Sequence, residues 1–403
     1  MLDVAAVLEA RGRVMEVARQ TPLDYSYTFS ERTGAEIHLK LENLQRTGSF
    51  KIRGATNRIA FLDDDERAAG VVTASAGNHA QGVALAAERA GVDAKIVMPE
   101  YAPVSKVEAT RAYGAEVVLH GVNYDTAQER AHEIERAEGR TYIHAFDDER
   151  VMAGQGTIGL EIIDADPDAD TVVVPVGGGG LIAGMATALK ADDPETRVIG
   201  VQAEGASAMA ESLQKGSRVE HETVDTIADG IAVGKPGSHT FEIVRKRVDE
   251  IVTVSDAAIA RTLVDLLERS KTLVEGAGAI ALAAVVEEAF DYEDDEVVVP
   301  ALCGGNIDLN VLRNVITRGL VEDGRYLKIR TTLKDRPGAL EALVEILADA
   351  RANIYGIKHE RTSLDIGVGS TDVELDLETR GHEHVARLLA ELEANGYEVE
   401  VLV

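Results

Sequence analysis

The stretch Thr171–Leu181 reads TVVVPVGGGGL, and it decides the fold class of the chain. Its first six residues are apolar and rich in valine, which predicts a strand buried on both faces, as in a parallel sheet. Four glycines follow, and Leu181 then opens an Ala-rich helical segment. Consecutive glycines let backbone N–H groups surround an anion at the positive end of a helix. A plain turn needs one or two glycines, and the spacing matches neither a Walker loop nor a dinucleotide fingerprint. The turn therefore predicts a phosphate site without favouring a nucleotide.

Short apolar strands and Ala-rich helices alternate on both sides of this turn, from residue 37 to about residue 320. We predict strands at Ile37–Leu41, Gly70–Thr73, Ala94–Met98, Glu116–Leu119, Thr171–Val176, Val198–Gln202 and Val297–Leu302. We predict helices at Gly77–Arg89, Ser105–Tyr113, Tyr124–Glu138, Leu181–Ala191, Asp256–Ser270 and Gly278–Glu288. Apolar strands joined by helical crossovers indicate an α/β fold with parallel sheets, whose ligands bind at the carboxyl ends of the strands.

The pattern changes after Gly324, which indicates a second domain. The predicted elements are strand Tyr326–Leu333, helix Pro337–Arg351, strands Asn353–Glu360 and Gly367–Glu378, helix His382–Asn395 and strand Tyr397–Val403. Their βαββαβ order is typical of a ferredoxin-like domain. We place the boundary near Val321–Arg325, where polar residues and a glycine form a flexible join.

Composition predicts a soluble, cytoplasmic protein. No stretch approaches the ~18 consecutive apolar residues of a membrane helix, and the N-terminus has no signal-peptide pattern. The single cysteine, Cys303, cannot form an intramolecular disulfide. The chain has 70 acidic against 41 basic residues and a net charge of -29, so it would repel a nucleic-acid backbone. The same charge suggests the hypothesis of adaptation to high salt, where screening removes self-repulsion.

Lys51 follows the run Thr47-Gly48-Ser49-Phe50, where a predicted strand passes through a polar turn into a helix. A lysine at the mouth of an α/β sheet can lose its hydration, which lowers its pKa and frees the neutral amine for imine formation. The alternative is a surface lysine near a helix start.

Two other polar turns follow predicted strands, Ser75–His79 and Leu302–Asn306. The first can form a nest of donors for a substrate carboxylate, or a helix cap in which Ser75 or Asn78 satisfies first-turn amides. In the second, Cys303 taken alone is interpreted as a small buried hydrophobic residue.

In this order and at these separations, the four segments resemble the fold-type-II pyridoxal-phosphate enzymes, specifically the threonine/serine dehydratase (ammonia-lyase) branch. The resemblance covers residues 1 to about 320. It implies pyridoxal 5'-phosphate as cofactor and a two-lobed core like that of tryptophan synthase β. A small lobe at about 47–146 would be inserted in the large lobe, and the protein would form a homodimer or homotetramer.

The resemblance also implies roles for individual residues. Lys51 would bind the cofactor aldehyde covalently and later remove the Cα proton, with Phe50 against the ring and Asn78 at its 3'-oxygen. Cys303 would lie beside the pyridine nitrogen, and Glu275 near the cofactor. The phosphate would be held by Gly177, Gly178, Gly179, Gly180 and the Leu181 amide. The substrate would be held by Ser75, Ala76, Gly77, Asn78 and His79.

The reaction implied is β-elimination of L-threonine to 2-oxobutanoate and ammonia, the first step of isoleucine biosynthesis, and also of L-serine to pyruvate. A neutral thiol at Cys303 would leave the ring a weaker electron sink than an aspartate would, which favours prompt loss of the β-hydroxyl.

Three alternatives remain. Serine racemases of this fold carry a serine as a second proton donor where this chain has Ala76, which disfavours racemisation. They also have acidic metal ligands at two positions where this chain has Gln202 and Ala208, so we predict no metal. β-Replacement enzymes typically read Lys-Asp-Arg where this chain has Lys51-Ile52-Arg53. A non-catalytic amino-acid-binding regulator is the alternative of a different class, although such a protein has no use for a buried amine beside a phosphate site.

Residues 326–403 resemble the ACT regulatory module. The run Asp335-Arg336-Pro337-Gly338-Ala339 places an N-cap acid, an early helical proline and a glycine between the first strand and helix. The resemblance implies an effector site at Asp335, Pro337, Gly338 and Ala339 for a branched-chain amino acid such as isoleucine or valine. The alternative is a dimerisation module without a ligand.

Overall fold

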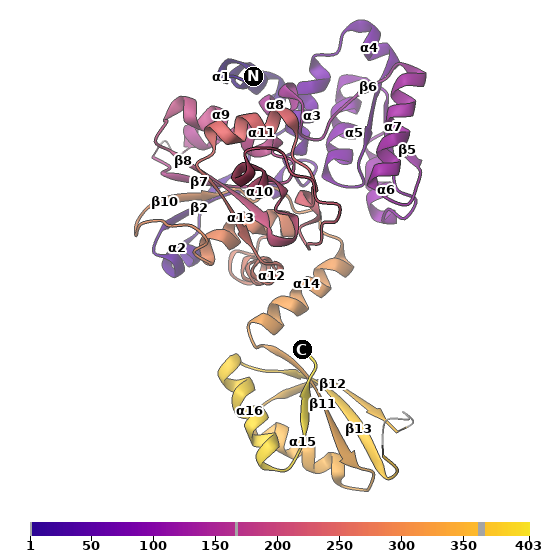
Figure 1. Cartoon of the computed structure of the whole chain (residues 1–403), viewed down its shortest axis with the longest axis vertical. Coiled ribbons are helices and arrows are strands. Elements are labelled where there is room, and N and C mark those ends of the chain that lie inside the picture. The colour runs from indigo at the N-terminus through magenta and orange to yellow at the C-terminus, as the bar shows by residue number, and fades with distance from the viewer. Residues whose placement is uncertain (1, 166–167, 362–366) are drawn as a thin grey trace. The chain divides into compact units, whose positions relative to one another are not determined.

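The structure is a computed structural model that describes residues 2–165, 168–361 and 367–403. Contacts divide the chain into two compact units, Met1–Asp308 and Leu309–Val403 (Figure 1). The first unit holds two sheets and the second holds one. Within the described ranges, no helix is both long enough and apolar enough to span a membrane.

The larger sheet has the order β1-β2-β10-β7-β8-β9. All neighbours are parallel except β1 and β2, which are antiparallel. Its strands are β1 (Leu23–Tyr25), β2 (Glu36–Lys40), β7 (Thr171–Pro175), β8 (Arg197–Ala203), β9 (Glu250–Val254) and β10 (Val297–Pro300). Because β7 lies in the interior of this sheet and is buried throughout, it has the continuous apolar sequence that the pattern predicted.

The smaller sheet is wholly parallel, with the order β5-β4-β3-β6. Its strands are β3 (Val71–Ala74), β4 (Ala94–Met98), β5 (Glu116–Leu119) and β6 (Thr141–Tyr142). Figure 1 shows the two sheets of the first unit in separate lobes, and helices α3 and α8, which pack on each other, lie between them. The α/β class with parallel sheets is confirmed.

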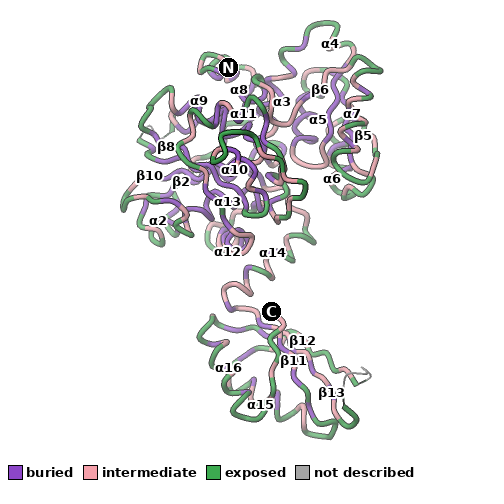
Figure 2. Tube along the Cα trace, viewed as in Figure 1, coloured by how far each residue is buried: buried purple, intermediate pink, exposed green. Residues whose placement is uncertain are grey.

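Helices cover both sheets of the first unit. Helix α9 packs on β7, and α13 packs on β7, β8, β9 and β10. All of α13 except its last residue is buried, as the purple tube of Figure 2 shows. A helix that is apolar on every side is stable only when it is enclosed in this way. The helices are α1 (Val4–Val17), α2 (Tyr27–Thr33), α3 (Lys51–Ala60), α4 (Asp64–Ala69), α5 (Asn78–Ala90), α6 (Val104–Ala112), α7 (Tyr124–Glu138), α8 (Glu149–Ala165), α9 (Gly180–Asp192), α10 (Ala208–Lys215), α11 (Ser238–Arg247), α12 (Asp256–Asp265) and α13 (Gly276–Val286).

The second unit has the predicted βαββαβ order, preceded by α14 (Leu309–Glu322). Its antiparallel sheet has the order β12-β13-β11-β14, and two helices bury a shared core of leucine, isoleucine and valine against it. The elements are β11 (Tyr326–Lys334), α15 (Ala339–Asp349), β12 (Asn353–Glu360), β13 (Ser370–Glu378), α16 (His382–Ala394) and β14 (Val399–Val401). The contact division falls before α14, whereas the domain boundary predicted near 321–325 falls after it.

Several sequence-based boundaries need correction. Strands β1, β6 and β9 were not predicted, since β6 has two residues and β1 and β9 are partly exposed. The helix predicted over Asp256–Ser270 is α-helical only to Asp265 and continues as a π-helix. The predicted N-cap acid Asp335 is not a cap: Gly338 precedes α15 with φ 85°, and Asp335 pairs with Arg361 at 3.2 Å.

Candidate active site

The glycine turn between β7 and α9 presents a row of free backbone donors. Among the described residues, no protein group accepts a hydrogen bond from the N–H of any of residues 177–181. Gly179 has φ 95°, a left-handed conformation that other residues adopt only with strain. Gly178, Gly179 and Gly180 are buried, so these donors require an acceptor that a bound anion can supply.

Neighbouring side chains hold the turn in this shape. A Cβ added to Gly178 would overlap the Phe146 ring, and one added to Gly180 would lie 2.8 Å from the Phe146 Cβ. The Gly178 carbonyl accepts a hydrogen bond of 2.6 Å from the Thr240 hydroxyl. Glycine is therefore needed here both for backbone conformation and for close packing.

Lys51 begins α3, directly after Phe50. Its ammonium Nζ donates to the Ala145 carbonyl at 3.1 Å and lies 5.2 Å from the centre of the Phe50 ring. Burial lowers the pKa of Lys51 to about 8, against the opposing influence of Cys303 and Glu275. A neutral amine is thus accessible near neutral pH, as imine formation requires.

Behind Lys51, a buried four-charge cluster fixes the first turn of α3. Arg53 is fully buried and donates to Glu42 at 2.7 and 2.9 Å and to Glu161 at 2.6 and 2.9 Å. Lys40 donates to Glu161 at 2.6 Å. Burial lowers the pKa of Lys40. For Glu42, burial is opposed by the charge and hydrogen bonds of Arg53, the charge of Lys40 and the bond from Thr21, which together lower the carboxyl pKa. Sequence reasoning missed this cluster, because Glu161, which joins Lys40 to Arg53, lies 108 residues beyond Arg53.

The turn Ser75–Gly77 leads from β3 into α5. Neither of the side-chain caps considered above forms: Gly77 is the N-cap residue, and the Ser75 hydroxyl accepts from the Gly77 N–H at 3.2 Å. The Asn78 amide donates to Glu275 Oε1 at 2.5 Å and accepts from Asn306 at 2.8 Å. The N–H groups of Ser75 and Gly77 already donate, to the Val97 carbonyl and the Ser75 hydroxyl. Those of Ala76, Asn78 and His79 have no acceptor among the described residues, so they can bind a carboxylate.

Two further residues of the predicted site lie at this turn. The ring of His79 is buried, its Nε2 lies 2.9 Å from the Ile143 carbonyl, and burial lowers its pKa to about 3. His79 is therefore a neutral group bonded to the backbone. The side chain of Ala76 is partly exposed beside it.

Cys303 lies beyond the end of β10, next to the residues that precede Lys51. The Phe50 N–H donates to the Cys303 carbonyl at 3.2 Å, and the Gly305 N–H donates to the Gly48 carbonyl at 2.8 Å. The buried thiol donates to the Ala277 carbonyl at 3.1 Å, and burial raises the pKa of Cys303. Burial also raises the pKa of Glu275. Cys303 is therefore a protonated, neutral group.

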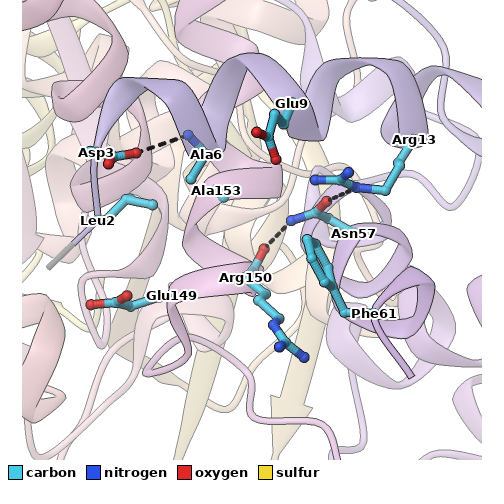
Figure 3. A pocket seen from close by; sticks show the side chains of 10 residues that line it. All are labelled: Leu2, Asp3, Ala6, Glu9, Arg13, Asn57, Phe61, Glu149, Arg150 and Ala153. Carbon is cyan, nitrogen blue, oxygen red and sulfur yellow. Dashed lines mark hydrogen bonds between the residues drawn. The ribbon is translucent and has the colours of Figure 1, made fainter. Parts of the chain in front are cut away.

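A separate cavity of about 200 Å³ is lined by none of the groups described so far (Figure 3). It lies between α1, α3 and α8. Asn57 accepts from the Arg13 side chain at 2.9 Å and donates to the Arg150 carbonyl at 2.7 Å. The guanidinium groups of Arg13 and Arg150 lie 4.4 and 4.5 Å from the centre of the Phe61 ring. These contacts anchor α3 to its neighbours.

The fold thus brings together the segments around Lys51, Asn78, the glycine turn and Cys303. The last three closely follow the carboxyl ends of β3, β7 and β10, whereas a longer turn of residues 41–50 separates Lys51 from β2. Sequence reasoning missed the supporting residues Ala145, Phe146 and Thr240, which belong to no recognisable motif. Asn306 ends the polar turn Leu302–Asn306, and its position after a predicted strand was the available signal.

Comparisons with known proteins agree with this arrangement. The family model described as pyridoxal-phosphate dependent enzyme matches residues 14–304. An L-threonine ammonia-lyase of Thermotoga maritima is 49% identical over 402 residues, covering 100% of both chains. The solved threonine deaminase isoform 2 of Solanum lycopersicum has a TM-score of 0.76 and 42% identity, over 78% of this chain and 92% of that one. Maize serine racemase has a TM-score of 0.75 and 35% identity, over 79% and 98%. The chain belongs to the family of pyridoxal-phosphate dependent enzymes.

Proposed function

We propose that the protein is an L-threonine ammonia-lyase, which converts L-threonine to 2-oxobutanoate and ammonia and L-serine to pyruvate. The proposal rests on one observation: the Lys51 amine, whose pKa is lowered, and the unpartnered amides of residues 177–181 belong to the same site. These groups fit the aldehyde and the phosphate of pyridoxal 5'-phosphate. The identity to ammonia-lyases along the whole chain supports threonine as the substrate.

The residues divide the work of the reaction. When bound, pyridoxal phosphate supplies an electron-accepting ring conjugated to the substrate amine. The amides of residues 177–181 would hold its phosphate, Phe50 would lie against its ring and Asn78 at its 3'-oxygen. The Lys51 amine would remove the Cα proton as general base. In the segment Ser75–His79, the free amides of Ala76, Asn78 and His79 would orient the substrate carboxylate.

Cys303 sets the reaction outcome in this proposal. Its thiol is protonated and donates to Ala277, so it offers no negative charge to hold a proton on the ring nitrogen. Glu275, which binds Asn78, is held toward its neutral form by burial. A ring kept neutral is a weaker electron sink, which favours elimination of the β-hydroxyl over repeated protonation at Cα. Ala76 also leaves no hydroxyl for a second proton donor.

The test is product release by the purified protein from L-threonine and L-serine. We expect 2-oxobutanoate and pyruvate, respectively, with ammonia, and no activity from Lys51→Ala. D-serine formation without pyruvate would indicate a racemase instead. A protein that binds the cofactor without turning over either amino acid would refute the lyase proposal.

The C-terminal unit supports a regulatory role. We propose that it is an ACT domain and that the turn Asp335–Ala339 binds isoleucine or valine. Such an effector suits an enzyme that catalyses the first step of isoleucine biosynthesis. We further propose that the protein is a homodimer or homotetramer in the cytoplasm. The left-handed Gly338 opens α15, whose first-turn amides can bind a carboxylate. Coupling requires an effect on activity or substrate affinity. An unchanged rate across millimolar isoleucine or valine would leave a dimerisation module as the better explanation.

The net charge of -29 supports adaptation to high salt. We expect the protein to unfold on dialysis into low salt, and stability that does not depend on salt would contradict this proposal.

A further inference from the structure

One segment that sequence analysis did not single out connects the smaller sheet to the larger one. His144–Asp148 follows β6 and precedes α8. It contains no glycine or proline, and its side chains are only partly buried. Four of its residues nevertheless make contacts that converge on Lys51 and the glycine turn.

His144 organises the segment through its ring. Its Nδ1 accepts hydrogen bonds from the backbone N–H of Phe146 at 3.1 Å and of Asp147 at 2.8 Å. A nitrogen that accepts two such bonds carries no proton, so the ring is neutral and holds its one proton on Nε2. Its edge-to-face contact with Phe146, at 4.7 Å between ring centres, fixes the ring plane.

The backbone that His144 holds contacts Lys51 directly. The Ala145 carbonyl accepts from Lys51 Nζ at 3.1 Å. Phe146 packs against Gly178 and Gly180 of the glycine turn. A shift of this short segment would therefore move both the acceptor for the amine and the surface that supports the donors for the phosphate.

Asp147 makes a second link to the glycine turn. Its carboxylate accepts from the N–H groups of Ser238, His239 and Thr240 at 2.8 to 3.2 Å, at the start of α11. These bonds outweigh burial and lower the pKa of Asp147, so it is ionised at the positive end of a helix. Thr240 in turn donates to the Gly178 carbonyl at 2.6 Å.

We infer that the His144–Asp148 segment positions Lys51 against the glycine turn, with His144 Nδ1 and the Asp147 carboxylate as its two positioning groups. The inference rests on the proposed function, because it assigns the supports of that same site. Neither residue needs to touch the reacting atoms. His144 acts through Ala145 and Phe146, and Asp147 acts through α11.

Two substitutions of similar size distinguish the role of the Nδ1 acceptor from that of the ring. His144→Asn keeps an acceptor near the place of Nδ1, whereas His144→Leu removes it. The holoenzyme of each is compared with wild type for the affinity of pyridoxal phosphate, its phosphorus-31 NMR shift, and kcat and KM for L-threonine. His120→Leu is the matched control, since His120 is exposed directly after β5.

For His144→Leu we expect kcat and cofactor affinity each to fall by about tenfold to a hundredfold, with a moved phosphorus signal, because a misplacement of ~1 Å has such effects. For His144→Asn and His120→Leu we expect values within about threefold of wild type. Wild-type affinity and phosphorus shift in His144→Leu would overturn the inference. An equal loss of kcat and cofactor affinity in His144→Asn and His144→Leu would also overturn it, because the shape of the ring would then matter and not its acceptor.

If His144→Leu does not fold, Asp147→Asn decides the matter, because it keeps the shape and removes the charge at α11. We expect weaker cofactor binding and a moved phosphorus signal, and wild-type values for both would refute the inference. A wild-type protein without lyase activity would refute the proposed function alone. The cofactor affinity and phosphorus shift would still test the positioning role.

Discussion

Replacing Arg53 with methionine tests whether the buried charge cluster holds α3, and therefore Lys51, in place. Methionine keeps much of the side-chain volume and removes the guanidinium. Lys40 would still pair with Glu161 at 2.6 Å, but Glu42 would retain only the Thr21 hydroxyl as a side-chain donor. Glu42 is fully buried, and with Lys40 facing both carboxylates the cluster would be left with one uncompensated negative charge.

Removing one partner of a buried ion pair costs about 3–5 kcal/mol, and we expect Arg53→Met to lower the free energy of unfolding by that amount. Adding Glu42→Gln should recover about 1–3 kcal/mol, because it removes the stranded charge. Arg130→Met is the control. Arg130 pairs with Glu133 in an exposed i,i+3 pair, so its loss should cost at most about 1 kcal/mol.

The measurement is urea denaturation followed by circular dichroism, with equal m-values across the variants. The pH dependence gives a second check. In the wild type the folded-state pKa of Glu42 is lowered, so its stabilising contribution is present above the unfolded pKa and lost as pH falls through the folded value. In Arg53→Met, protonation of Glu42 should instead relieve the buried charge, so the gap to wild type should narrow on acidification. A loss no larger than that of Arg130→Met, or a gap independent of pH, would refute this reasoning.

Three further predictions concern the site. Gly178→Ala should weaken cofactor binding, measured by equilibrium dialysis, by about tenfold or more, because the added methyl overlaps Phe146. In the control Gly12→Ala the added methyl meets no atom within 4 Å, so the cofactor affinity should not change. The rate at which apoenzyme captures pyridoxal phosphate, followed by visible absorbance, should rise with pH and level off above about 8, since the neutral amine is the nucleophile; a rise continuing toward the ordinary lysine pKa would contradict the burial of Lys51. Cys303 should resist iodoacetamide at pH 8 until the protein is unfolded, as mass spectrometry of the labelled chain would show, because burial raises its thiol pKa; rapid labelling of the native protein would contradict this.

The amino-acid sequence by itself determined the α/β class, most of the strands of the two parallel sheets and the βαββαβ order of the C-terminal unit. It could do so because these features depend on local periodicity. An interior strand such as β7 is apolar at every position, whereas an amphipathic helix repeats every 3.6 residues. The glycine turn was visible for the same reason, since four glycines between a strand and a helix form a local signal.

Only the tertiary structure decided how the site is supported. The pairing of Arg53 with Glu161, the contacts of His144–Asp148 with Lys51 and with the start of α11, and the bond from Asn306 to Asn78 join residues far apart in sequence. No local pattern encodes such pairs, because each residue also reads as an ordinary polar residue in its own segment. The state of Lys51 likewise depends on burial by the whole fold, since loss of hydration is what lowers its pKa.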